Sequence, residues 1–275
     1  MLKHIIFITK KTIPVLKQLE EQCKKEGVHL YYELPEKETS IAETVYVTDR
    51  EDICRGLLEE DANVLVWLHE ENRSQNLSMA LFAMEKIEEL DYEYIKRIYQ
   101  RYYNLPWNIA ETKRCIIREM TEDDLDAIYQ VYGGESITKY MEDLYEDREK
   151  EREYTKSYIE NAYRFYGYGT WLIQKKENGK IIGRVGFNMR DGFEDVELGF
   201  VIMEEEQRKG YAFECCQRVI EIGKEEYEFE KIQALVQEGN VASIQLCKKL
   251  GFHTNEKVMI EGKEYLKFIK ILHSV

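Results

Sequence analysis

The 275-residue sequence has no excess of positive charge. It contains 39 Lys and Arg residues against 53 Asp and Glu residues, a formal net charge of −14. Nucleic-acid binding depends on clustered Lys and Arg side chains that neutralise phosphates. The composition therefore argues against a nucleic-acid partner. It suits a basic or amine-bearing ligand, although an acidic balance is also the commonest solvated surface.

Histidine and cysteine are few and show no paired spacing. The five histidines are scattered, so we predict no metal site. Among the six cysteines, the adjacent Cys215 and Cys216 would point to different sides of a helix. Free, mostly buried thiols in a reducing cytoplasm are the simplest interpretation. We therefore expect a cytoplasmic protein.

Long hydrophobic runs are also absent. No stretch approaches the roughly 20 apolar residues that a membrane span needs. The run HIIFIT at residues 4–9 is too short for a signal peptide, and Lys10 and Lys11 follow it. We expect neither a membrane partner nor secretion.

The first third alternates strand and helix patterns. It predicts a small, Rossmann-like, mostly parallel α/β domain over residues 1–110. Expected strands are 4–9, 28–34, 44–47 and 63–68, and expected helices are 12–26, 51–60, 78–90 and 91–103, with Gly27 ending the first helix and Asp49 capping the second.

The pairs Thr48-Asp49 and His69-Glu70 follow strands, where α/β ligand sites lie. Capping and turn formation explain both pairs more simply, so we favour an interaction or substrate-presenting role for this domain over a catalytic one. Pro106 disfavours helix at Leu105, which puts the domain join between residues 104 and 113.

Residues 111–275 form the second predicted domain. Expected strands are 115–118, 171–175, 181–188, 198–203, 231–237, 252–260 and 265–272. Expected helices are 121–132, 152–166, one that opens within 207–212 and runs to about 227, and 240–251, with an irregular acidic stretch at 140–147. Residues 166–169 (YGYG) form a glycine-rich turn that could present a tyrosine to a substrate, although the tyrosines before it form mainly a packing stripe.

The stretch ELGFVIMEEEQRKGYA, residues 197–212, carries the strongest chemical signal. An apolar strand runs through an acidic turn into a glycine-containing helix start. Such a start leaves several backbone N–H groups unpaired, and with the helix dipole they suit a phosphate or pyrophosphate. Gly210 would let the loop turn tightly. Taken alone, the same pattern is typical of an ordinary strand-to-helix turn in a structural or partner-binding module.

The order of the elements that follow favours the anion-binding interpretation over an ordinary turn. After the loop come a helix, the strand KIQALVQ and then EGNVASIQLCKKLGF. This ordered set resembles the GNAT superfamily of acyl-CoA-dependent N-acyltransferases over about residues 114–272. The resemblance implies a GNAT-type mixed, largely antiparallel α+β domain. It also implies an N-acetyltransferase that uses acetyl-CoA as cosubstrate and a primary amine, on a protein N-terminus or a small molecule, as acceptor.

The same resemblance implies roles for named residues. The backbone around Phe200, Val201 and Ile202 would bind the acyl carbonyl and the pantetheine arm. The pyrophosphate would be held by the loop residues Gln207, Arg208, Lys209, Gly210, Tyr211, Ala212 and Phe213. Asn240 caps the next helix and, with Ser243, would also touch the pantetheine or its phosphate end.

Two residues are candidates for proton transfer. Glu197 lies where the ribosomal-protein alanine acetyltransferase branch, which this half resembles most, usually has an acid that relays the amine proton. Alternatively it only hydrogen-bonds nearby backbone, and Glu194 and Asp195 are rivals. Cys247 stands where many family members carry a tyrosine that protonates the departing thiolate. It is a candidate acid, although we favour a small apolar filler, and a tyrosine-dependent mechanism is excluded.

Because Cys247 replaces the tyrosine that many family members carry, an alternative function is a CoA-binding sensor or pseudoenzyme without turnover.

Overall fold

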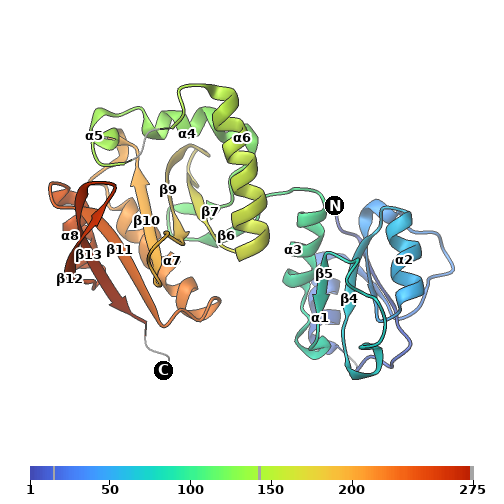
Figure 1. The fold of residues 1–275 in the computed structure, drawn as a ribbon. Coiled ribbons are helices and arrows are strands. Elements are labelled where there is room, and N and C mark those ends of the chain that lie inside the picture. The colour runs from blue at the N-terminus through green and yellow to red at the C-terminus, as the bar shows by residue number, and fades with distance from the viewer. Residues whose placement is uncertain (15, 142–143, 273–275) are drawn as a thin grey trace. The chain divides into compact units, whose positions relative to one another are not determined.

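The structure of the protein is a computed structural model that describes residues 1–14, 16–141 and 144–272. The chain divides into two compact units, Met1–Leu105 and Pro106–Val275 (Figure 1). Two parts of the predicted second domain, residues 142–143 of the expected irregular stretch and residues 273–275, lie outside the described residues.

The first unit contains a parallel five-stranded sheet in the order β2-β1-β3-β4-β5. Its strands are β1 (His4–Ile8), β2 (His29–Tyr31), β3 (Thr44–Thr48), β4 (Asn63–Trp67) and β5 (Phe82–Met84). Every residue of β3 and β4 is buried, as expected for parallel strands covered on both faces.

Helices cover both faces of this sheet. The α-helices are α1 (Lys17–Glu26), α2 (Glu51–Glu59) and α3 (Tyr92–Tyr102), with short 3₁₀ turns at Ile41–Glu43, Glu70–Asn72 and Ile87–Glu89. Phe7 shares a core with α1 and α3, whereas its neighbour Ile6 shares one with Cys54 of α2. Alternate residues of β1 therefore face opposite helical layers. Gly27 ends α1 in the left-handed conformation, as predicted.

Three expectations for this unit are wrong. Residues 78–90 contain β5 and a 3₁₀ turn instead of a helix, because Phe82–Met84 pairs with β4 and completes the sheet. Asp49 does not cap α2; its carboxylate accepts hydrogen bonds from the Lys10 and Lys11 amides at 2.7 and 2.9 Å. The first helix begins five residues later than expected, at Lys17 rather than at residue 12.

The second unit contains an eight-stranded sheet in the order β12-β13-β11-β10-β9-β8-β7-β6. All neighbours are antiparallel except β10 and β11, which are parallel. The strands are β6 (Asn108–Glu111), β7 (Cys115–Arg118), β8 (Thr170–Lys175), β9 (Ile181–Asn188), β10 (Val196–Ile202), β11 (Lys231–Gln237), β12 (His253–Ile260) and β13 (Lys263–Ile271). The mixed, largely antiparallel sheet agrees with the prediction, whereas β6 lies in the segment expected to be a domain join.

The helices of the second unit are α4 (Leu125–Tyr132), α5 (Glu135–Thr138), α6 (Arg148–Tyr158), α7 (Tyr211–Glu225) and α8 (Val241–Lys249), with 3₁₀ turns at Glu122–Asp124 and Glu204–Glu206. The predicted helix 152–166 is α6 followed by a π-helical segment, Ile159–Tyr166.

Residues of β9 alternate between the two faces of the sheet. Phe187 faces α7, because a Cβ on Gly223 would lie 2.7 Å from the Phe187 ring. Asn188 faces α6, where it accepts a hydrogen bond from Tyr158 Oη at 3.0 Å. We call the face that carries Asn188 the α6 face.

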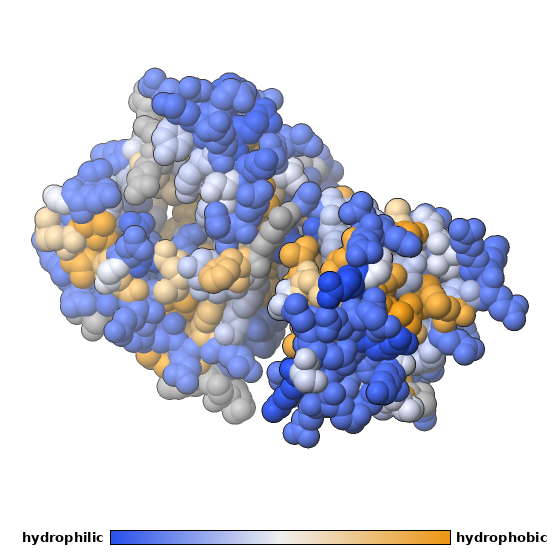
Figure 2. Space-filling model, turned by 45° about the vertical axis from the view of Figure 1, so that its right-hand side comes forward, coloured by the Kyte–Doolittle hydropathy of each residue, from blue (hydrophilic) through white to orange (hydrophobic). Residues whose placement is uncertain are grey.

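Hydrophilic residues cover most of the visible surface, and hydrophobic residues lie in scattered patches (Figure 2). No described helix is both long and apolar enough to cross a membrane.

Candidate active site

The parallel pairing between β10 and β11 ends after two residue pairs. Val196 lies opposite Ile232 and Glu197 opposite Gln233, and no later pair joins these two described strands. Beyond this point β10 continues along β9, whereas β11 continues along β13 (Figure 1). The backbone of β10 after Glu197 therefore has a side without a partner strand, which we call the open edge of β10.

The register of β10 with β9 decides which amides face the open edge. In an antiparallel pair, alternate residues direct both backbone groups to the partner strand. The Met203 N–H donates to the Ile182 carbonyl at 2.8 Å, so Val201 also points to β9. The N–H groups of Phe200 and Ile202 therefore point to the open edge, and neither has a hydrogen-bond partner in the described chain. The Val201 amide, which the sequence placed with them, is used in the sheet.

The loop after β10 leaves a run of unpaired amides. The Gln207 N–H donates to Glu204, and the first helical bond of α7 runs from the Glu214 N–H to the Gly210 carbonyl at 3.2 Å. Between them, the N–H groups of residues 208–213 make no hydrogen bond to any residue that the structure describes. Arg208 and Gly210 both have left-handed φ angles, 60° and 86°. Together with the dipole of the 15-residue helix α7, these amides form a site for an anion.

Arg114, on the segment before β7, holds this loop. Its Nη1 donates to the Lys209 carbonyl at 3.0 Å, and its guanidinium lies over the Tyr211 ring at 4.1 Å. Its amide and Nε donate to the two carboxylate oxygens of Glu214 at 2.9 and 2.7 Å. Burial alone would raise the pKa of Glu214, but hydrogen bonds from Thr112 and Arg114 outweigh it and hold the pKa below 4.5. Arg114 is not among the site residues predicted from the sequence, because no local pattern marks it.

The two cations of the loop differ. Lys209 Nζ lies 3.0 Å from the carboxylate of Glu206, which Lys175 also approaches at 3.6 Å. Hydrogen bonding from Lys209 lowers the pKa of Glu206, so this carboxylate remains ionised and balances the Lys209 charge. Arg208 is exposed and forms no ion pair with a described residue. Arg208 is therefore the better placed of the two to meet an anion. Gln207 instead donates from Nε2 to the Ile202 carbonyl at 3.0 Å.

Glu197 lies on the α6 face of the sheet, opposite Asn188. Its side chain is 11% exposed, and one carboxylate oxygen accepts a hydrogen bond from Arg190 Nε at 2.7 Å. A carboxylate paired with a guanidinium is a weaker base, because the cation stabilises its ionised form. Of the two rivals, Asp195 pairs with Lys231 at 2.9 Å and Glu194 is exposed ahead of the strand.

The residues expected on α8 have structural roles. Asn240 is the N-cap, as predicted, and its side chain accepts the Ser243 amide at 3.1 Å. Gly251, with a φ of 84°, follows the helix end. Cys247 has 0% exposure in the core, and burial raises the pKa of its thiol to about 12. A thiol that holds its proton this strongly is a poor acid for a thiolate, so the geometry favours the apolar filler over the acid.

The YGYG turn does not present its second tyrosine on the α6 face. Tyr168 makes edge contacts with Phe187 and Phe229, and the Tyr227 hydroxyl donates to the Gly167 carbonyl at 2.9 Å. Because Phe187 faces α7, Tyr168 belongs to the opposite side of the sheet. On the α6 face, the Tyr158 hydroxyl accepts the Thr170 amide at 2.7 Å and donates to Asn188.

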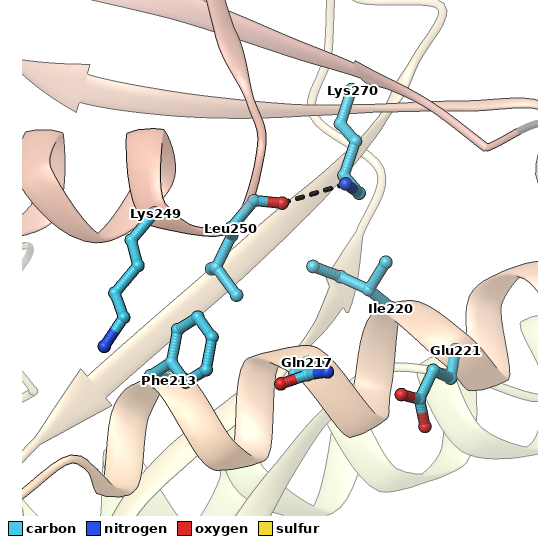
Figure 3. A pocket seen from close by; sticks show the side chains of 7 residues that line it. All are labelled: Phe213, Gln217, Ile220, Glu221, Lys249, Leu250 and Lys270. Atoms are coloured by element: carbon cyan, nitrogen blue, oxygen red, sulfur yellow. Dashed lines mark hydrogen bonds between the residues drawn. The ribbon is translucent and has the colours of Figure 1, made fainter.

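A cavity of about 290 Å³ adjoins the beginning of α7 (Figure 3). Phe213, the last residue of the unpaired run, lines it together with residues farther along α7, the end of α8 and Lys270 of β13. Lys249 Nζ lies 4.2 Å from the centre of the Phe213 ring, and Lys270 Nζ donates to the Leu250 carbonyl at 2.8 Å. Lys249 therefore places a positive charge in this cavity, against the side chain of the last residue of the unpaired run.

Comparison with known proteins identifies the class to which this fold and site belong. Residues 114–253 match the family model described as the acetyltransferase (GNAT) domain. The chain belongs to the GNAT family and is an acetyltransferase, so the resemblance found in the sequence is confirmed. Members of this family in general use acetyl-CoA and an amine acceptor. Residues 1–113 lie outside the match.

Curated relatives and solved structures agree with this family. YoaA and YnaD of Bacillus subtilis (strain 168), both described as uncharacterized N-acetyltransferases, are among the similar proteins. YoaA is 29% identical over 52% of this chain and 82% of its own length, and YnaD is 28% identical over 56% and 89%.

Solved structures with a similar fold include two acetyltransferases. The ribosomal-protein-S5-alanine acetyltransferase from Vibrio fischeri has a TM-score of 0.52 at 16% identity, covering 59% of this chain and 96% of that one. The acetyltransferase from Agrobacterium tumefaciens str. C58 has a TM-score of 0.51 at 21% identity, covering 58% and 92%.

Proposed function

We propose that the second unit binds acetyl-CoA and transfers the acetyl group to a primary amine. The observation that carries this proposal is the run of six unpaired amides at residues 208–213, directly after a strand with an open edge. Hydrogen bonds to a charged acceptor contribute about 1.5–3 kcal/mol each, so a few of these amides suffice to hold a diphosphate. Arg208 adds a cation at the same place.

The open edge of β10 would hold the reacting end of the cosubstrate. The N–H groups of Phe200 and Ile202 are the donors available there, one to polarise the thioester carbonyl and one to bind the arm behind it. Donors already aimed at a developing oxyanion need no rearrangement during the reaction, which is why such groups contribute strongly to rate. Ser243, near the start of α8, is a further candidate to contact the pantetheine arm.

The reaction needs one proton acceptor. The amine nitrogen attacks the carbonyl carbon, the carbon–sulfur bond breaks, and the thiolate leaves. Glu197 is our candidate to receive the amine proton, through water, because its carboxylate is mostly buried on the α6 face one residue before the open edge. The ion pair with Arg190 would keep it ionised and ready to accept. The thiolate is a good leaving group and can take its proton from solvent, so no role for Cys247 is needed.

Calorimetry with acetyl-CoA, followed by a thiol-release assay with a panel of amines, tests the proposal. We expect saturable binding and thiol release that depends on the amine. Absence of binding at millimolar acetyl-CoA would overturn the proposed site. Binding without thiol release for any amine would favour the sensor function over the enzyme.

A further inference from the structure

Arg184, in the middle of β9, is a guanidinium without a carboxylate partner among the residues that the structure describes. Its Nε is buried and has no hydrogen-bond partner. Its other nitrogens make only long contacts, Nη1 to the Tyr132 hydroxyl at 3.5 Å and Nη2 to the Met120 sulfur at 3.8 Å. The titratable groups that act on it most strongly are tyrosine hydroxyls, and no carboxylate is among them.

Three other partly buried arginines of this unit each have a carboxylate partner. Arg114 binds Glu214, Arg118 binds Asp124 at 2.7 Å, and Arg190 binds Glu197. The chain has 53 acidic residues, so a partner for Arg184 would have been easy to supply. A buried cation without a counter-charge is destabilising, because its lost hydration is not replaced. This cost is expected where a ligand supplies the missing charge.

The position of Arg184 connects it to the proposed reaction. It lies directly opposite Val201, between the two residues whose amides face the open edge of β10. Side chains of directly paired residues lie on the same face of a sheet, so Arg184 shares the α6 face with Asn188 and Glu197. Arg184 and Asn188 are four residues apart on β9, a separation of about 13 Å at 3.3 Å per residue.

The strip of sheet between them carries no side chain. Gly186 and Gly199 form the pair between the Arg184–Val201 and Asn188–Glu197 pairs. The backbone of Gly169 and Thr170 occupies the space where Gly186 would carry a Cβ, whereas a Cβ on Gly199 would meet only Asn188 Nδ2, at 3.4 Å. A small reactant could therefore lie over Gly199 on β10, with one end toward the guanidinium and the other near Glu197. Arg184 is of intermediate exposure as a whole residue, so part of it remains accessible.

We infer that Arg184 binds a carboxylate on one of the two reactants, and that this reactant is the acceptor, an amine that also carries a carboxylate, such as an amino acid or short peptide. Arginine suits this role because its planar guanidinium binds both oxygens of a carboxylate. The inference rests on the proposed acetyl transfer and narrows its substrate class. A polycationic amine is disfavoured, because it would bring positive charge to an unneutralised guanidinium.

The test compares matched acceptors at saturating acetyl-CoA. L-Amino acids and dipeptides are assayed beside their carboxamides, which differ only in the missing charge. We expect the free acids to be preferred. We expect Arg184→Met to raise KM for the acids by about tenfold to a hundredfold while leaving the carboxamides unchanged. Arg218→Gln is the matched control, since Arg218 lies on α7 and pairs with Glu221.

A second arm assigns the source of the carboxylate. Succinyl-CoA and acetyl-CoA are compared with 2-phenylethylamine as acceptor. A preference for succinyl-CoA that Arg184→Met abolishes would keep the carboxylate site but move it to the acyl group. Equal use of acids and carboxamides, with no preference for succinyl-CoA, would overturn the inference. If acetyl-CoA binds and some amine is still acetylated, the proposed function survives that result; if acetyl-CoA does not bind, the proposed function itself fails.

Thermal unfolding separates ligand binding from a structural role. If Arg184 serves a ligand, Arg184→Met removes an unpaired charge and is expected to leave Tm unchanged or raise it. A clear fall in Tm, with parallel losses for acids and carboxamides, would show that the arginine is structural. Arg184→Lys keeps a charge without the planar pair of donors and is expected to restore the preference for acids only in part.

Discussion

The amide and Nε of Arg114 both donate to the carboxylate of Glu214. Arg114, which directly precedes β7, is thereby fixed to the first turn of α7. The same guanidinium reaches the Lys209 carbonyl within the anion-binding loop. The shape of the loop therefore depends on an interaction between residues that are 100 positions apart.

Replacing Glu214 by Gln is expected to weaken acetyl-CoA binding and lower the free energy of unfolding by about 1–2 kcal/mol, because the pair is only partly exposed. The effect should depend on pH. The pKa of Glu214 is lowered in the folded state, so its contribution is present above about pH 4.5 and is lost as the pH falls through the folded-state value. Thermal melts from pH 7 to pH 3 should show that the wild-type protein loses more stability than Glu214→Gln. Equal losses for the two proteins would contradict a stabilising role for the ionised Glu214 carboxylate.

Replacing Gly210 by Val is expected to raise the dissociation constant of acetyl-CoA at least roughly tenfold, about 1.4 kcal/mol. Gly210 has a φ of 86°, which a β-branched residue rarely adopts, so the amides of the loop would change direction. Gly192→Val is the matched control, since Gly192 has a φ of 84° and open space around it. Calorimetry on both variants should show weakened binding only for Gly210→Val; equal affinities would remove the loop from the site.

Replacing Glu197 by Gln is expected to lower kcat by at least about tenfold without changing acetyl-CoA affinity, if this carboxylate accepts the amine proton. Arg190→Gln gives a second measurement. Without the cation the ionised carboxylate is less stable, so the acidic limb of the pH–rate profile should move to higher pH. A variant at position 197 that keeps full rate at pH 7, or a profile that does not move, would exclude Glu197 as the base.

Unlike Glu197, Cys247 is expected to take no part in the reaction. Cys247→Ala should leave kcat and its pH dependence unchanged, because the thiol is fully buried and burial raises its pKa to about 12. Its stability should fall by about 1–2 kcal/mol for the lost packing volume. Thiol-release kinetics and urea unfolding measure the two effects separately. A tenfold loss of kcat with little loss of stability would reinstate Cys247 as a participant.

The features that the sequence predicted well depend on short-range rules. The anion loop follows from an apolar strand, a left-handed glycine and a helix start that lie within about fifteen residues of one another, and the Asn240 cap from a residue and its third successor. The features it missed depend on partners far along the chain. Asp49 follows the local rule for a cap, yet amides nearly 40 positions away, those of Lys10 and Lys11, bind its carboxylate instead.

The same reason explains the missed strand and the missed arginines. Phe82–Met84 is only three residues long, too short to carry a period, and becomes a strand because β4 offers it an edge. Arg114 and Arg184 look like any other arginine in the sequence. What distinguishes them is that Arg114 has Glu214 beside it and Arg184 has no carboxylate partner in the described part of the chain, and neither fact is visible before the chain is folded.

The early end of the β10–β11 pairing has a consequence for the exchange of backbone hydrogens with solvent. Within one strand, the Val201 hydrogen is held in the ladder with β9, whereas those of its two neighbours, Phe200 and Ile202, are not. Deuterium labelling of the unliganded protein, followed by NMR, should therefore show slow exchange at Val201 between two fast positions. Acetyl-CoA should slow the two fast positions, and this alternation would report occupancy of the open edge without any assay of turnover.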